Sequence, residues 1–137
     1  MSGTSRAILG LLMGGGVAVG IVRALEQLAN QVNMPNGLDP TNLDQVKSAL
    51  ERGEFPFASL VLVLAGWLVA AYVGSRIAAT VGRARLPVLA FTVLFTTLTI
   101  HDLIVLPHPP WMWIGGALGV PLVALGAAGE SITVRGL

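Results

Sequence analysis

The chain has 137 residues, of which 54% are hydrophobic and only 11% are charged, and its formal net charge is +1. An average soluble domain carries about a quarter charged residues, so this composition leaves too little polar surface to coat a soluble globule. The small net charge and the lack of interleaved basic and aromatic residues exclude nucleic acid as an expected partner. The absence of cysteine excludes disulfides, thiolate metal sites and cysteine nucleophiles.

Long stretches without charged side chains predict an all-α fold, a four-helix transmembrane bundle. A helix that crosses a membrane needs roughly 20 apolar residues, and somewhat shorter stretches can span if flanking arginines extend toward the headgroups. The predicted transmembrane helices lie at 5–30, 57–80, 86–105 and 110–130. The first stretch loosely resembles a signal peptide, but we expect a retained helix. Residues 1–137 are therefore expected to form a single transmembrane domain.

A short amphipathic interfacial helix is predicted between the first two spans, at 42–52. Thr41 is the expected N-cap, because a threonine side chain can accept a hydrogen bond from the first turn of a helix. The apolar stripe of this helix consists of Leu43, Val46 and Leu50. Charged residues face elsewhere, which is typical of a helix that lies on a membrane surface or on the rim of a bundle.

The distribution of basic residues predicts the orientation of the four spans. One side of the four-span arrangement carries Arg6, Arg76, Arg83, Arg85 and Arg135, and the other side carries Arg23, Lys47 and Arg52. Cytoplasmic loops of membrane proteins carry an excess of lysine and arginine. We therefore expect a multi-pass membrane protein with both termini in the cytoplasm.

Small residues spaced four apart predict the faces by which the helices pack, because such residues let two helix backbones approach closely in a bilayer. These helix-packing residues are Gly10, Gly14, Gly16 and Gly20 in the first span, Gly66, Ala70 and Gly74 in the second, and Gly115 and Gly119 in the fourth. Packing inside the bundle is the favoured interpretation. Docking against another protein, or self-association, is the alternative.

Aromatic residues at the predicted span ends are expected to anchor the helices, because amphipathic rings favour the headgroup layer. These interface anchors are Phe57, Trp111 and Trp113. Trp67 is an exception, since it lies in the middle of the second span. The proline-rich loop before Trp111 is stiff, and we expect it to hold His108 above the membrane.

Four titratable residues are expected to meet at the membrane boundary opposite the termini, and they form the candidate polar cluster: Glu26, His101, Asp102 and His108. Arg23 is expected to pair with Glu26, one turn away on the same helix. A carboxylate beside histidines can bind a divalent metal, relay protons or hold a lipid headgroup. The spacing matches no metal or nucleophile motif, so we favour a structural role over a lipid or small-molecule contact and over metal or proton chemistry. No metal site and no cofactor is predicted, whereas a bound lipid is compatible with the pattern.

Several local motifs follow one another along the chain. They are a first helix ending near Glu26, a Pro-Asn-Gly-Leu-Asp-Pro loop at 35–40, a short amphipathic helix, a glycine-laddered second span and a Pro-His-Pro-Pro-Trp loop at 107–111. This order resembles an uncharacterised family of small bacterial four-helix integral membrane proteins with a Pro-His-Pro-x-Trp loop. The residues at the characteristic positions of that family are Glu26, Asp39, His108, Pro109 and Trp111. The chain departs from the pattern at Asn30, where another histidine is expected, and the resemblance implies topology but no mechanism.

The favoured functional hypothesis is a non-catalytic accessory or scaffold subunit of a larger membrane complex, with respiratory and photosynthetic assemblies as candidates. Its partners would be membrane lipids and other membrane subunits, or further copies of the chain. A small oligomeric transporter or channel is the first alternative, although the spans contain few charged residues to line a pathway. An intramembrane enzyme that uses the candidate polar cluster is the second alternative. No catalytic residue is assigned, because the sequence contains no strong catalytic motif.

Overall fold

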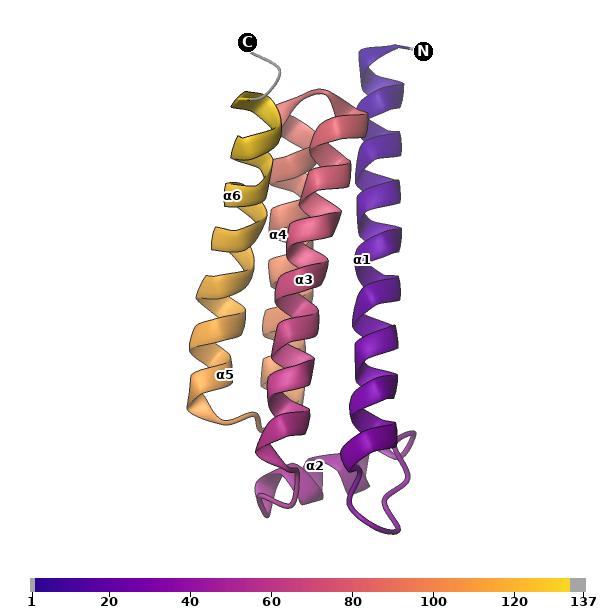
Figure 1. Cartoon of the computed structure of the whole chain (residues 1–137), viewed down its shortest axis with the longest axis vertical. Helices are drawn as coiled ribbons and strands as arrows, with labels where there is room; N and C mark the ends of the chain where they lie inside the picture. Colours follow the sequence, from indigo (N-terminus) through magenta and orange to yellow (C-terminus); the bar gives the residue numbers. More distant parts are fainter. Residues whose placement is uncertain (1, 134–137) are drawn as a thin grey trace.

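The computed structural model describes residues 2–133, including their side chains except at 32, 33 and 130–133. The helices are, in chain order, α1 (Gly3–Asn33), α2 (Leu43–Glu51), α3 (Phe57–Gly82), α4 (Arg85–Val105), α5 (Pro110–Ile114), the π-helical segment η1 (Gly115–Gly119) and α6 (Val120–Thr133). Four long segments run side by side, the fourth made of α5, η1 and α6, and α2 crosses one end of the bundle (Figure 1). The described residues contain no strand, so the predicted all-α four-helix bundle with a short helix after the first span is confirmed.

Each of the four long segments is long and apolar enough to cross a membrane. The candidate spans are Gly3–Gln31, Phe57–Gly82, Arg85–Val105 and Pro110–Gly129. Large apolar side chains such as Leu12, Val93 and Leu122 are exposed on the outer faces of the bundle. A continuous apolar surface of this kind is stable against lipid tails and unstable against water. The chain is therefore a multi-pass membrane protein.

Helix α2 confirms the predicted short helix, but its N-cap differs from the prediction. The side-chain oxygen of Asn42 accepts a hydrogen bond from the Gln45 backbone N–H at 3.2 Å. Thr41 donates its own amide and hydroxyl to Asp39 Oδ1, at 2.9 and 2.7 Å. The prediction of Thr41 as the N-cap is wrong, because the turn at Asp39 uses this side chain before the helix begins.

The fourth span is interrupted by the π-helical segment η1, whereas the sequence predicted a uniform helix at 110–130. Pro121 lies two residues after this segment and has no backbone N–H, so it cannot donate the helical hydrogen bond to the Ala117 carbonyl. A wider turn just before the proline accommodates the missing bond and the bulk of the ring. Glycines allow close neighbours here, since a Cβ built on Gly116 would lie 3.0 Å from the Leu103 side chain.

Helices α1 and α3 approach each other at the level of their backbones near the start of α1. A Cβ built on Gly10 would lie 2.6 Å from the Gly82 nitrogen, and one built on Gly14 would collide with the Gly74 carbonyl oxygen. A Cβ built on Gly74 would also collide with the Phe91 ring of α4. No larger residue fits at these positions without a shift, so Gly10, Gly14 and Gly74 lie at the centre of the helix packing.

Four further packing residues also face neighbouring helices. A Cβ built on Gly66 would lie 3.2 Å from the Leu25 side chain of α1, and Ala70 is fully buried in the core. Gly115 and Gly119 lie against leucine side chains of α3, with built Cβ distances of 2.7 and 3.2 Å. Gly115 and Gly119 thus bring the fourth span close to α3, which is the helix at the centre of the bundle.

The glycine pair Gly16 and Gly20 lies on an open face of α1. A Cβ built on either residue would meet nothing within 4 Å, so this pair does not pack inside the bundle as expected. Successive residues of a helix are rotated by about 100°, and Gly16 therefore faces nearly opposite to Gly14, which lies against α3. The alternative interpretation for this pair, docking against another chain, remains a prediction.

Candidate functional site

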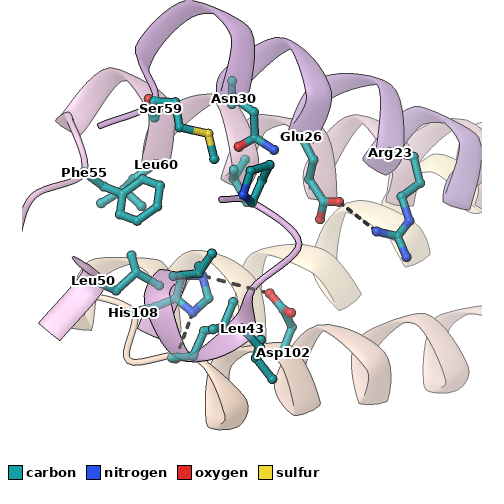
Figure 2. Close-up of a pocket in the computed structure, with 16 residues that line it drawn as sticks. Arg23, Glu26, Asn30, Leu43, Leu50, Phe55, Ser59, Leu60, Asp102 and His108 are labelled. Carbon is teal, nitrogen blue, oxygen red and sulfur yellow. Dashed lines mark hydrogen bonds and ion pairs between the residues drawn. The ribbon is translucent and has the colours of Figure 1, made fainter. Parts of the chain in front are cut away.

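A cavity of about 280 Å³ lies beneath α2, where α1, α3 and the α4–α5 loop meet. Its apolar wall includes the three residues of the α2 stripe, together with residues of α3. Its polar lining consists of Arg23, Glu26, Asn30, Ser59, Asp102 and His108. The carboxylates of Glu26 and Asp102 face the same space, with His108 beside Asp102 (Figure 2). We call this space the head cavity.

A second cavity of about 240 Å³ lies between α1 and α4, with Trp67 of α3 also in its lining. Its apolar lining residues are Val19, Val22, Trp67, Phe95 and Leu98. Arg23, Glu26 and Asp102 line this space as well as the head cavity. Three charged residues therefore line both a chamber at the end of the bundle and a groove within the span. We call this second space the α1–α4 groove.

The predicted pair of Arg23 and Glu26 is confirmed, with the Arg23 Nη1 and Glu26 Oε2 atoms 3.5 Å apart. The Arg23 side chain is 78% exposed, so solvent and lipid headgroups weaken this pair, and the contact to Glu26 is made through the Nη1 nitrogen. Glu26 itself is only partly exposed. The arginine is therefore free to bind an anion at the rim of the head cavity while it still partly balances Glu26.

His108 points into the bundle, and the expectation that it stands above the membrane stays a prediction. Its side chain is only 4% exposed, and its ring packs edge-on against Trp67 with a centroid distance of 5.7 Å. Its Nδ1 atom lies 3.0 Å from the Leu106 carbonyl oxygen, which can only accept, so Nδ1 carries the proton. Burial lowers the pKa of His108, although the nearby Asp102 carboxylate opposes this shift. Neutral His108 then presents an unprotonated Nε2.

Asp102 faces His108 without a direct hydrogen bond. The Nε2 atom of His108 and the Oδ2 atom of Asp102 are 3.9 Å apart, which is longer than a hydrogen bond. When His108 is neutral, both atoms are acceptors, and like acceptors do not bind each other. A group with two or more N–H or O–H donors placed between them would satisfy both.

The structure brings together three of the four predicted cluster residues and leaves out His101. His101 is exposed and lines neither cavity. It precedes Asp102 directly in α4, and adjacent helix positions differ by about 100°, which turns the His101 side chain away from the direction of Asp102. Ser59 joins the site without having been predicted. Its Oγ is buried and has no hydrogen-bond partner among the described residues, and it lines the head cavity.

The lining contains a serine, a histidine and an aspartate, but their arrangement does not match a hydrolytic triad. In a triad, one histidine nitrogen faces the serine and the other faces the aspartate. In this chain Nδ1 of His108 binds the Leu106 carbonyl and Nε2 faces Asp102, so no ring nitrogen is left for Ser59. Among the described residues, no group of three or more histidine, aspartate or glutamate side chains is placed to hold a metal ion.

The three predicted interface anchors lie at this end of the bundle. The Phe57 and Trp111 rings pack against each other with a centroid distance of 5.3 Å and an interplanar angle of 54°. Phe57 is exposed, and Trp113 is exposed in part. These rings join the starts of α3 and α5. Their position at the helix starts suits a headgroup layer.

Comparison with known proteins adds no assignment to this geometry. No protein-family model, no curated protein and no solved structure matches the chain. The resemblance to the small bacterial family therefore stays a prediction that rests on the motifs themselves.

Proposed function

We propose that this chain is a non-catalytic accessory membrane protein that binds an amphiphilic molecule. The polar head would occupy the head cavity and an acyl chain would occupy the α1–α4 groove. One observation carries the proposal: Arg23, Glu26 and Asp102 line both spaces, so the chamber that holds the further polar residues Asn30, Ser59 and His108 and the groove whose other lining, apart from Thr99, is apolar share the same charged residues. An amphiphile likewise joins a polar head directly to an apolar chain.

The character of each space supports this assignment. Ligand sites are typically concave and mostly apolar, with a few polar groups that fix the orientation of the ligand. The head cavity fits this description, since leucine, valine and phenylalanine side chains surround its six polar residues. The unpartnered Ser59 hydroxyl also favours a polar occupant, because a buried hydroxyl without a hydrogen bond is costly.

The alternatives of a transporter and an enzyme are less well supported by the same geometry. Both cavities lie toward the α2 end, whereas glycine contacts such as Gly14 with Gly74 close the other half of the bundle. A single chain therefore offers no polar pathway across the membrane within the described residues. For an enzyme, neither ring nitrogen of His108 is available to activate Ser59.

The test is native mass spectrometry of the full chain, purified in mild detergent, with extraction and identification of the retained lipids. Val19→Trp should fill the α1–α4 groove and abolish retention, because Val19 lines that groove. Val17→Trp is the matched control, since Val17 is also exposed on α1 but lines neither cavity. Equal lipid retention by the two variants, or no retained amphiphile in the wild type, would contradict the proposal.

A second candidate function is that of a scaffold subunit which docks a partner helix on α1. The open glycine pair Gly16 and Gly20 favours it, because small residues on an outer face permit a close approach by another helix. Gly16→Leu should release a co-purifying partner or separate copies of the chain in mild detergent. Gly126→Leu is the control, since Gly126 also faces open space but lies on α6. The same set of partners in both variants would remove this candidate.

We also propose that the protein lies in the bacterial inner membrane with both termini in the cytoplasm, so that the head cavity faces the outer leaflet. The basic residues Arg83 and Arg85 at the α3–α4 turn support this orientation. Arg135, which was counted on the same side, lies outside the described residues. An impermeant thiol reagent should label Asn36→Cys in intact cells but not Ala84→Cys. The opposite labelling pattern would reverse the orientation.

A further inference from the structure

The head cavity is lined by hydrogen-bond acceptors and by one cation, which is paired with the Glu26 carboxylate. The acceptors are the Asp102 carboxylate and Nε2 of His108, whose other nitrogen is bound to the Leu106 carbonyl. The cation is the guanidinium of Arg23, which is largely exposed. The site therefore offers complementary charge to a ligand that carries both a positive donor group and a negative group.

The two acceptors define the positive part of the ligand. They lie 3.9 Å apart and have no donor between them. A primary ammonium group carries three N–H donors and a positive charge, so it can bind the carboxylate and the imidazole nitrogen together. A quaternary ammonium group has no N–H and can satisfy neither acceptor by hydrogen bonding. Asn30 and the unpartnered hydroxyl of Ser59 line the same cavity and provide further oxygen acceptors.

The negative part of the ligand is defined by Arg23. Arg23 lines both the head cavity and the α1–α4 groove, whereas His108 lines the head cavity alone, so the arginine is closer than His108 to the apolar space. Arginine recognises phosphate through several N–H donors in a fixed planar arrangement. In a phospholipid the phosphate lies between the terminal head group and the acyl chains. The order of these groups in the lipid is the order of the subsites in the protein.

We infer that the site recognises a phospholipid whose head carries a primary ammonium group, the phosphoethanolamine type. The ammonium lies between Asp102 and His108, the phosphate lies at Arg23, and an acyl chain lies in the α1–α4 groove along Val22 and Leu98. This assignment rests on the amphiphile-binding function proposed above and adds the chemical class of the head group.

The experiment places the full chain in detergent with an equimolar mixture of phosphatidylethanolamine, phosphatidylcholine and phosphatidylglycerol, and native mass spectrometry counts the retained lipids. We expect the ethanolamine lipid to be retained about tenfold over the choline lipid, because charged hydrogen bonds distinguish the two heads. Equal retention of these two lipids by the wild type would overturn the inference while leaving amphiphile binding intact. A wild type that retains no lipid would overturn the proposed function itself.

Two variants test the separate subsites. Asp102→Asn should abolish the preference for ethanolamine over choline, and Asp44→Asn, the same change on the exposed face of α2, should keep it. Arg23→Gln should lower the retention of all three lipids and leave the preference unchanged, since each of them carries a phosphate. A preference that survives in Asp102→Asn, or one that disappears in Asp44→Asn, would contradict the assignment of the ammonium position.

Soluble phosphoethanolamine separates the lipid from its free head group. It should displace the bound lipid only at a large excess, because it lacks the chain that fills the α1–α4 groove. Displacement at equal concentration would assign the site to a water-soluble amine and overturn the lipid assignment.

Discussion

The two ends of the bundle are built in different ways. At the α3–α4 turn the chain reverses within two residues, with Arg83 in the left-handed conformation at φ 51°, and glycines hold α1 against the backbone of α3. At the α2 end, a nine-residue helix and a proline-rich loop cover the head cavity, and the charged residues Glu26 and Asp102 line both this cavity and the α1–α4 groove. One end is closed by backbone contact, and the other is hollow and polar.

This difference separates the part that holds the fold together from the part that can bind a ligand. Helices in lipid associate through close packing, which small residues allow, so the backbone contacts at the closed end help to stabilise the bundle. Charged groups within a span are costly and usually mark a functional site, which is the situation at the hollow end. Substitutions at the closed end should therefore change stability, and substitutions at the hollow end should chiefly change binding.

The largest effect on stability is expected for Gly14→Val at the closed end. Its new side chain would collide with the Gly74 carbonyl oxygen, and a backbone atom cannot move aside as a side chain can. The free energy of unfolding should fall by about 1–3 kcal/mol, as for other overpacked cores. Gly16→Val is the control and should stay within about 0.5 kcal/mol, because its side chain enters open space. Detergent unfolding followed by circular dichroism measures both, and equal losses would contradict the packing.

A smaller loss is expected for Ser75→Ala, which tests the contact between α3 and the fourth span. The buried Ser75 hydroxyl donates a hydrogen bond to the Ala124 carbonyl oxygen at 2.5 Å. Its removal should lower the free energy of unfolding by about 1 kcal/mol, which is typical of hydrogen bonds between membrane helices. Thr97→Val should have almost no effect, because the Thr97 hydroxyl bonds only within its own helix and is exposed. A larger loss in Thr97→Val than in Ser75→Ala would reverse this ranking.

At the hollow end, stability should depend weakly on pH through His108. Burial lowers the pKa of His108 below its usual 6.5, so the folded state binds fewer protons than the unfolded state in acid. The free energy of unfolding should fall as the pH drops below about 6.5, by at most about 1.4 kcal/mol per pH unit for one proton. The facing groups are Asp102, Glu26, Arg23 and the Trp67 ring. His108→Gln should remove this part of the slope, and an unchanged slope would show that His108 is not buried as neutral imidazole.

The smallest effect is expected in the exposed loop before α2. Asp39 accepts the amide and hydroxyl of Thr41, and these hydrogen bonds lower the pKa of Asp39. The contribution of Asp39 is present above its usual pKa of 3.8 and is lost as the pH falls through its lowered value. Asp39→Asn should speed amide hydrogen exchange at Thr41 at neutral pH and leave the unfolding midpoint unchanged. Asp44→Asn should alter neither, and a shifted midpoint in Asp39→Asn would mean that this loop supports the bundle.

The span positions were predictable because each depends on a local run of apolar residues. The predicted helix at 86–105 differs from α4 by one residue at its start, and the one at 57–80 differs from α3 by two residues at its end. The π-helical segment was missed although its signal, Pro121 after a run of glycines, is present in the sequence. The cap of α2 was missed because Asn42 and Thr41 are both good capping residues, and only the turn at Asp39 decides between them.

The candidate site was predictable only in part. Glu26, Asp102 and His108 could be grouped because the four-span topology places the ends of α1 and α4 and the last loop on one side of the membrane. Topology fixes the depth of a residue but not the direction of its side chain. It therefore could not exclude His101, and it could not reveal that His108 turns inward to Trp67. Ser59 carried no signal, since a serine near the start of a helix is common.

The sequence by itself determined that this protein crosses a membrane four times with a short amphipathic helix after the first span, because transfer into lipid depends on the summed apolarity of each segment. The tertiary structure alone decided which glycines contact another helix and which face outward, as Gly14 and Gly16 do. It also decided that Arg23, Glu26 and Asp102 lie between two cavities. Those outcomes depend on how the helices rotate and lean against one another, which no single helix specifies.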